Sequence, residues 1–512
     1  MKWKIGAFSL LLGAILAGTS LAARPPRNTR AVELARRIDF ALDEAWTREG
    51  VTPVAPASDL ELLRRTTLDL LGTVPSLEEI RAFEAEKSEG RHERLVARLM
   101  ADSRFQWAFA ERLARITVGP GKKQDDLFYR RRRFVAWLKD QIARHRPWDD
   151  VVREIVGAEG VTVDGPANFV VSADVDPAKL AARTSRAFLG VRLDCAQCHD
   201  HPFSDWKQKD FEGLAAFFGR AQRKGPLVVE SNDGDYKLQD MKTGQERVVA
   251  PEVPFAPEAL EKTGKRRPAL ARWLTSDKNK YFAKAISNRL WAWLLGRGLI
   301  DPTDMIDEGK PRYPKVLELL EAELRANRYD LEEIVRAIVL TKAYALSSKG
   351  DAGLEPAFAV YPLKPLHADQ LANAIWQATS LETEDEDRGL LFRLAYLDQT
   401  NKFVQRHRGD HDAEVPEDET LLERLLLMNG GLVQERLKAD NIFTITSRLL
   451  ALAPTDDKLV EVAYLCVLTR RPTAAESAHF TERLHGDKDH RARAAEDLIW
   501  ALLNSSELAW NH

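Results

Sequence analysis

Apolar residues recur at steps of three and four positions along most of the chain, a spacing that places them on one face of an α-helix. Ser76, with Glu79 three residues later, has the pattern of a helix start. The hydrophobic pattern therefore predicts a mainly α fold. Between residues 30 and 160 it runs through AVELARRIDFALDEAW, DLELLRRTTLDLLG, RLVARLMADSRFQWAFAERL and RRRFVAWLKDQIARHRPWDDVVREIVGAEG.

A different pattern separates two helical regions. Residues 221–262 contain short apolar pieces, turn dipeptides and prolines, which are typical of a connection that is partly β or irregular, with a small β-hairpin. Helical spacing then resumes, and Gly296 or Gly298 is the expected C-cap of one helix. We therefore predict an N-terminal helical domain over residues 24–220 and a C-terminal helical domain over residues 263–512.

The first residues have the pattern of a secretory signal. Two lysines precede an apolar run from Ile5 to Leu16, and small residues then offer cleavage near Ala22 or Ala23. We predict a signal peptide over residues 1–23 and export to the periplasm or cell envelope. A retained membrane anchor is the alternative, although the run is shorter than the roughly 20 residues that a spanning helix needs. No later stretch predicts a transmembrane span in the mature chain.

Charge and cysteine content narrow the classes of partner and fold. The 75 basic and 78 acidic side chains nearly balance, so the total charge neither attracts nor repels nucleic acid, and we predict no nucleic-acid partner. Three cysteines in 512 residues are too few for a disulfide scaffold. Cys466 lies in the apolar segment VAYLCVLTR, where a buried, inert thiol is expected.

The segment CAQCHDHP holds the strongest chemical signal. If it is helical, Cys195, Cys198 and His199 lie on one face of one turn. Covalent attachment of haem uses this arrangement, since two thiolates add to the two vinyl groups and the adjacent imidazole reaches the iron. We therefore identify these three residues as candidate binding residues for haem c.

Two other interpretations of this segment remain open. Cys195 and Cys198, with His199 or His201 as metal ligands, could bind zinc or another divalent metal, a fourth ligand coming from elsewhere. Alternatively, the cysteines form a labile disulfide or are unmodified structural residues, because side chains one helical turn apart are a poor fit to disulfide geometry.

The interpretations imply different functions. Haem c implies electron transfer or small redox chemistry, with a cytochrome or another redox partner. The alternative is a non-haem envelope protein, metal-dependent or hydrolytic, that binds an envelope polysaccharide; its basis is the twelve tryptophans and the clustered histidines. The sequence assigns no catalytic residue, because no pair of acids can be chosen without knowing their separation.

Three segments carry a family resemblance: LLRRTTLDLLGTVPS, FLGVRLDCAQCHDHPFSDWKQKDFEGLAAFF and RRPALARWLTSDKNKYFAKAISNRLWAWLLGRGLIDPTDM. They resemble the tandem pair of uncharacterised domains in planctomycete secreted proteins that often accompany cytochrome c-like domains. The resemblance covers nearly the whole mature chain and includes the two cysteines and both histidines of CAQCHDHP. It implies export and a helical fold, and it brings no established activity.

Overall fold

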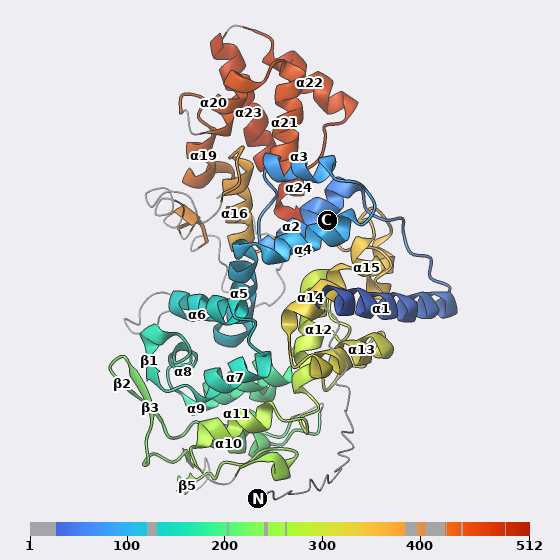
Figure 1. Cartoon of the computed structure of the whole chain (residues 1–512). Coiled ribbons are helices and arrows are strands. Elements are labelled where there is room, and N and C mark those ends of the chain that lie inside the picture. The colour runs from blue at the N-terminus through green and yellow to red at the C-terminus, as the bar shows by residue number, and fades with distance from the viewer. Residues whose placement is uncertain are drawn as a thin grey trace, which may run out of the picture.

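The computed structural model describes residues 27–119, 131–201, 204–239, 244–261, 264–384, 396, 399–400, 402–404, 425, 427–441, 444–486 and 488–512. The predicted signal peptide lies outside these residues. The predicted mainly α fold is confirmed (Figure 1). Helices up to the connecting segment are α1 (Arg27–Glu49), α2 (Asp59–Leu71), α3 (Leu77–Ala85), α4 (Arg91–Ala101), α5 (Ser103–Val118), α6 (Arg131–Ala143), α7 (Trp148–Gly157), α8 (Asn168–Ser172), α9 (Pro177–Thr184) and α10 (Gln208–Ala216).

The described chain also contains short helices of other types. These are the 3₁₀-helices η1 (Thr162–Asp164), η3 (Leu193–Gln197), η4 (Pro257–Ala259) and η5 (Ala352–Ala357), and the π-helix η2 (Ser185–Leu189). The later α-helices are α11 (Arg266–Leu274), α12 (Phe282–Leu295), α13 (Pro314–Ala326), α14 (Leu331–Val339), α15 (Lys342–Ala345), α16 (Ala368–Ala378), α19 (Gly431–Leu437), α20 (Ile445–Leu452), α21 (Asp456–Leu468), α22 (Ala474–Leu484), α23 (Lys488–Leu503) and α24 (Ser506–Ala509).

Local sequence signals fix several helix ends. The Ser76 hydroxyl accepts from the Glu79 amide at 3.1 Å, and the Glu79 carboxylate accepts from the Ser76 amide at 2.8 Å, so the predicted start of α3 is a complete capping box. Gly296 ends α12 with φ 78°, which confirms it as the C-cap. Such caps give hydrogen-bond partners to backbone groups that have none within the helix.

The strands form small antiparallel sheets, and β2 to β5 lie within residues 221–262, where a small β-hairpin was expected. β1 (Gly160–Val161), β3 (Leu227–Glu230) and β2 (Ala221–Lys224) form one sheet in that order. β4 (Lys237–Gln239) pairs with β5 (Glu246–Val248), with Lys237 opposite Val248. β6 (Lys364–Pro365) pairs with β7 (Trp510–Asn511), which brings the last residues back beside residue 364.

Buried apolar residues form two clusters. The larger runs from Ala31 to Tyr361 and also includes Leu465. The smaller joins the C-terminal helices α16 and α19–α24 to Leu68 and Val74 near the end of α2. Figure 1 shows helices α19–α23 gathered at one end of the molecule and α7–α11 at the other, with α2, α5 and α12–α14 between them. The predicted domain boundaries stay a prediction, because a hydrophobic cluster can extend across a domain interface.

Helix α2 connects distant parts of the chain through two fully buried arginines. Arg64 donates to the backbone carbonyls of Val467, Glu507 and Leu508, each at 3.2 Å. Arg65 donates to the Leu346 carbonyl at 2.7 Å and also to the Tyr344 carbonyl. Multiple hydrogen bonds offset the cost of burying a guanidinium, so each arginine fixes a different segment against α2.

In the described part of the chain, no helix is both long and apolar enough to cross a membrane.

Candidate functional site

The cysteine segment follows a tight reversal of the chain. Gly190 ends η2 in the left-handed region with φ 66°, and its carbonyl accepts from the Ile306 amide at 3.0 Å. A Cβ at position 190 would lie 3.0 Å from Ile306 Cδ1, so the approach favours glycine. Leu193 and Ala196 are fully buried and anchor η3, which packs on α9 and α10.

The two cysteines and His199 lie at the surface. The segment is a 3₁₀-helix that ends at Gln197, followed by a turn and bends, rather than one turn of α-helix. Cys195 lies within this 3₁₀-helix and Cys198 is its C-cap, so the two cysteines stand on either side of the helix end. Both thiols are free, and both cysteines and His199 are exposed.

The imidazole of His199 has a defined tautomer. Its Nδ1 lies 2.7 Å from the backbone carbonyl oxygen of Asp200. A carbonyl oxygen only accepts, so Nδ1 carries the proton and Nε2 carries the lone pair. Histidines that bind a metal usually donate their other N–H to a carbonyl or carboxylate in this way. His199 therefore presents a basic nitrogen to solvent beside the two thiols.

His201 has a different environment from His199. Its side chain is 6% exposed, and its Nε2 lies 3.5 Å from the Glu308 carboxylate. Its amide donates to the Trp206 carbonyl at 2.9 Å, and the Trp206 indole donates to Asp307 at 2.5 Å. Among the residues that the structure describes, no three His, Cys, Asp or Glu side chains are grouped so that they could hold a metal ion.

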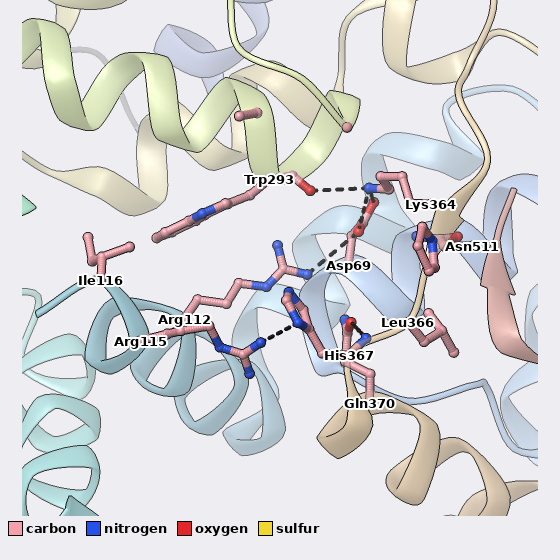
Figure 2. A pocket seen from close by; sticks show the side chains of 13 residues that line it. Asp69, Arg112, Arg115, Ile116, Trp293, Lys364, Leu366, His367, Gln370 and Asn511 are labelled. Carbon is pink, nitrogen blue, oxygen red and sulfur yellow. Dashed lines mark hydrogen bonds and ion pairs between the residues drawn. The ribbon is translucent and has the colours of Figure 1, made fainter. Parts of the chain in front are cut away.

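A second candidate site, which the sequence did not indicate, is a pocket between α5, α12, α16, β6 and β7 (Figure 2). Its volume is about 560 Å³, including the open mouth. His367, one of the residues that line it, is the N-cap of α16. The charged and imidazole side chains that line the pocket are Asp69, Arg112, Arg115, Lys364 and His367.

A buried ion pair forms one wall of the pocket. The Lys364 ammonium donates to both Asp69 oxygens, at 2.9 and 3.0 Å, and to two carbonyls in the last turn of α12, at 2.9 and 3.1 Å. The Tyr344 and Tyr361 hydroxyls donate to Asp69 Oδ2 at 2.9 and 3.0 Å. Burial lowers the pKa of Lys364 to about 8, while the Asp69 carboxylate opposes that shift. Every donor of Lys364 is therefore used within the protein.

The opposite wall carries two arginines of α5. Arg115 donates to the Asp369 carboxylate at 2.9 Å and to Nδ1 of His367. A guanidinium only donates, so Nδ1 of His367 accepts and the ring proton is on Nε2. Burial, and then the positive charge of Arg115, lowers the pKa of His367 well below its ordinary value, so this imidazole is neutral at pH 7. Figure 2 shows Arg112 beside it, below the Trp293 ring.

Comparison with known proteins identifies two regions of the chain. Residues 37–223 match the family model PSCyt2, described as a protein of unknown function (DUF1549). Residues 266–391 match the family model PSD1, described as a protein of unknown function (DUF1553). The chain therefore carries these two uncharacterised domains in tandem, the pair that its sequence resembles. No curated protein and no solved structure is significantly similar to it.

The two candidate sites lie differently in the PSCyt2–PSD1 pair. The cysteine segment is entirely within the PSCyt2 region. The pocket is shared: Asp69, Arg112 and Arg115 belong to PSCyt2, whereas Lys364 and His367 belong to PSD1. The sequence feature that could have drawn attention to the pocket is Asp69, a carboxylate within the otherwise apolar end of the segment TTLDLLG.

Proposed function

We propose that this PSCyt2–PSD1 protein is exported to the periplasm or cell envelope, binds one haem c through Cys195 and Cys198, and acts in electron transfer or small redox chemistry with a cytochrome or another redox partner. The single observation that carries the haem assignment is the arrangement of the free, exposed thiols beside His199, whose Nδ1 donates to the Asp200 carbonyl at 2.7 Å.

The residues present fit a covalently attached haem better than a zinc ion. Zinc needs ligand atoms that converge within about 2.0–2.3 Å of one point, and the described residues include no such group. Thioether attachment needs two accessible thiols on one side of a turn and a histidine with a free Nε2. The His201 side chain is nearly buried against Glu308, so it is less available as a metal ligand. This burial weakens the metal interpretation.

Each residue has a separate task in this proposal. Cys195 and Cys198 would hold the porphyrin covalently, and His199 would bind its iron through Nε2 while the Asp200 carbonyl fixes the ring orientation. Haem c supplies one-electron chemistry when bound. Exposure of the segment would allow a partner protein to approach the cofactor edge closely.

The test is to express the chain with haem-attachment machinery and denature the purified protein. Haem that remains with the polypeptide, and is lost when Cys195→Ala and Cys198→Ala are combined, supports the proposal. Cys466→Ala is the matched control, because that thiol is 1% exposed and burial raises its pKa to about 12. Haem-free protein with stoichiometric zinc would transfer the assignment to the metal interpretation.

Two further measurements separate the parts of the proposal. His199→Ala should keep the covalent haem but change its absorption spectrum, because the iron loses its protein ligand. Electron exchange between the reduced holoprotein and a c-type cytochrome tests the redox role, and its complete absence would overturn that role. N-terminal sequencing of the native protein tests export; an intact Met1 on cytoplasmic protein would refute it.

A further inference from the structure

We propose that the pocket between the PSCyt2 and PSD1 regions binds an oxyanion, a carboxylate, sulfate or phosphate group, with Arg112 as its main contact. The proposal is independent of the haem proposal, because it rests on different residues. Figure 1 shows α10, which packs on the cysteine segment, at the end of the molecule away from α16.

Arg112 is a partly buried cation whose guanidinium donates no hydrogen bond to a described residue. Its side chain is 17% exposed, and its one ionic contact in the described structure is with Asp69 Oδ1 at 3.6 Å, beyond hydrogen-bond distance. No described residue accepts a hydrogen bond from its guanidinium. Asp69 is already neutralised by Lys364. Its guanidinium lines the pocket, so it is available to a ligand that supplies acceptors.

Neighbouring groups on the pocket wall complement an anion. Arg115 donates a hydrogen bond to Nδ1 of His367, so the ring proton is on Nε2. The Nε2–H group is therefore a donor on a residue that lines the same pocket. Asn511 is 2% exposed and lines the pocket, and its Oδ1 has no hydrogen-bond partner among the described residues. Rotating this amide by half a turn would present its N–H₂ group instead. Two uncommitted polar groups thus accompany Arg112.

The charge balance and the position of the pocket agree with this assignment. Arg112, Arg115 and Lys364 carry three positive charges, and Asp69 and Asp369 carry two negative charges. The neighbouring Glu111 is paired with Arg131, so the cluster stays positive. A guanidinium matches planar and tetrahedral oxyanions through two parallel N–H donors. Ligand sites also favour the boundary between two domains, and this pocket draws its lining from both family regions.

Calorimetric titration of the full chain tests the proposal. Sodium sulfate, phosphate and acetate are titrated separately at constant ionic strength, with sodium chloride as the reference. We expect saturable one-site binding of at least one oxyanion. The ion that binds most tightly shows whether the natural ligand presents a sulfate, phosphate or carboxylate group. Arg112→Gln should weaken that binding roughly tenfold or more, since it removes charge-assisted hydrogen bonds. Arg144→Gln, the same change at an exposed arginine, should leave it unchanged.

The same variants check that the effect is local. Arg112 donates no hydrogen bond to a described residue, so Arg112→Gln should melt in chloride no lower than the wild-type protein. Arg112→Lys keeps the charge but loses the paired donors, and it should also bind more weakly. Heats that match chloride for all three oxyanions would overturn the proposal. Wild-type affinity in either Arg112 variant would overturn it as well.

Discussion

Replacing Asp69 by asparagine removes the counter-ion of a buried lysine while keeping the size of the side chain. In the native protein the Asp69 carboxylate accepts from Lys364 at 2.9 and 3.0 Å and from two tyrosine hydroxyls. The residue is 6% exposed, so water cannot replace these contacts. In Asp69→Asn the amide carries no charge, and its N–H₂ group faces donors. Lys364 is then a buried charge without a counter-ion, and only the two carbonyls of α12 still accept from it.

The expected loss in the free energy of unfolding is about 3–5 kcal/mol, the usual cost of removing one member of a buried ion pair. Urea denaturation of the full chain, followed by tryptophan fluorescence, measures it. Asp140→Asn, the same change at an exposed aspartate of α6, is the control and should stay within about 0.5 kcal/mol of wild type.

A double variant examines the cause. Adding Lys364→Met to Asp69→Asn removes the unpaired charge and should recover most of the loss, since well-packed apolar replacements of buried ion pairs are often neutral. A loss below about 1 kcal/mol for Asp69→Asn would contradict the reasoning. A double variant as unstable as the sum of the two single variants would show that the residues do not act as a pair.

Three other changes should have measurable effects. The pKa of Lys364 is about 8 in the folded protein, below its ordinary value of 10.5. Above pH 8 the unfolded chain therefore binds more protons than the folded protein, and stability rises with pH, by about 3 kcal/mol at most. Lys364→Met should lack this rise; a wild-type-minus-variant difference that is constant from pH 7 to 10 would refute it. Arg64→Met should lose roughly 2–4 kcal/mol and speed hydrogen exchange in α21, which unchanged protection would contradict. Gly165→Ala should lose about 2 kcal/mol or more, because φ is 106° and a Cβ would lie 2.4 Å from Trp137 Cβ; an unchanged melting temperature would disprove it.

The features that sequence reasoning predicted correctly depend on neighbouring residues. Helical periodicity is local, and so are the capping box of Ser76 and Glu79 and the C-cap at Gly296. The buried Cys466 was also predicted from its immediate surroundings. Periodicity did not distinguish an α-helical turn from the 3₁₀-helix at Cys195, because both place residues three apart on one side.

The pocket could not be predicted because its residues are far apart in the chain. Asp69 and Lys364 are separated by 295 positions, and Arg115 and His367 by 252. A charged residue in an amphipathic helix normally indicates a solvated face. Nothing in the segment TTLDLLG indicates that this carboxylate is buried against Lys364. Only the packing of α2 and α5 against the segment around residue 364 reveals the site.

The contacts of α2 also have a consequence for when this helix can become fully folded. Arg64 and its acceptor at Val467 are 403 positions apart. Ribosomes add roughly 5–20 residues per second, so about 20–80 s separate the synthesis of the two partners. Until the later helices exist, the two arginines of α2 are best left in water, and burying them would be unfavourable. One of the first helices to leave the ribosome is therefore among the last to complete its interactions.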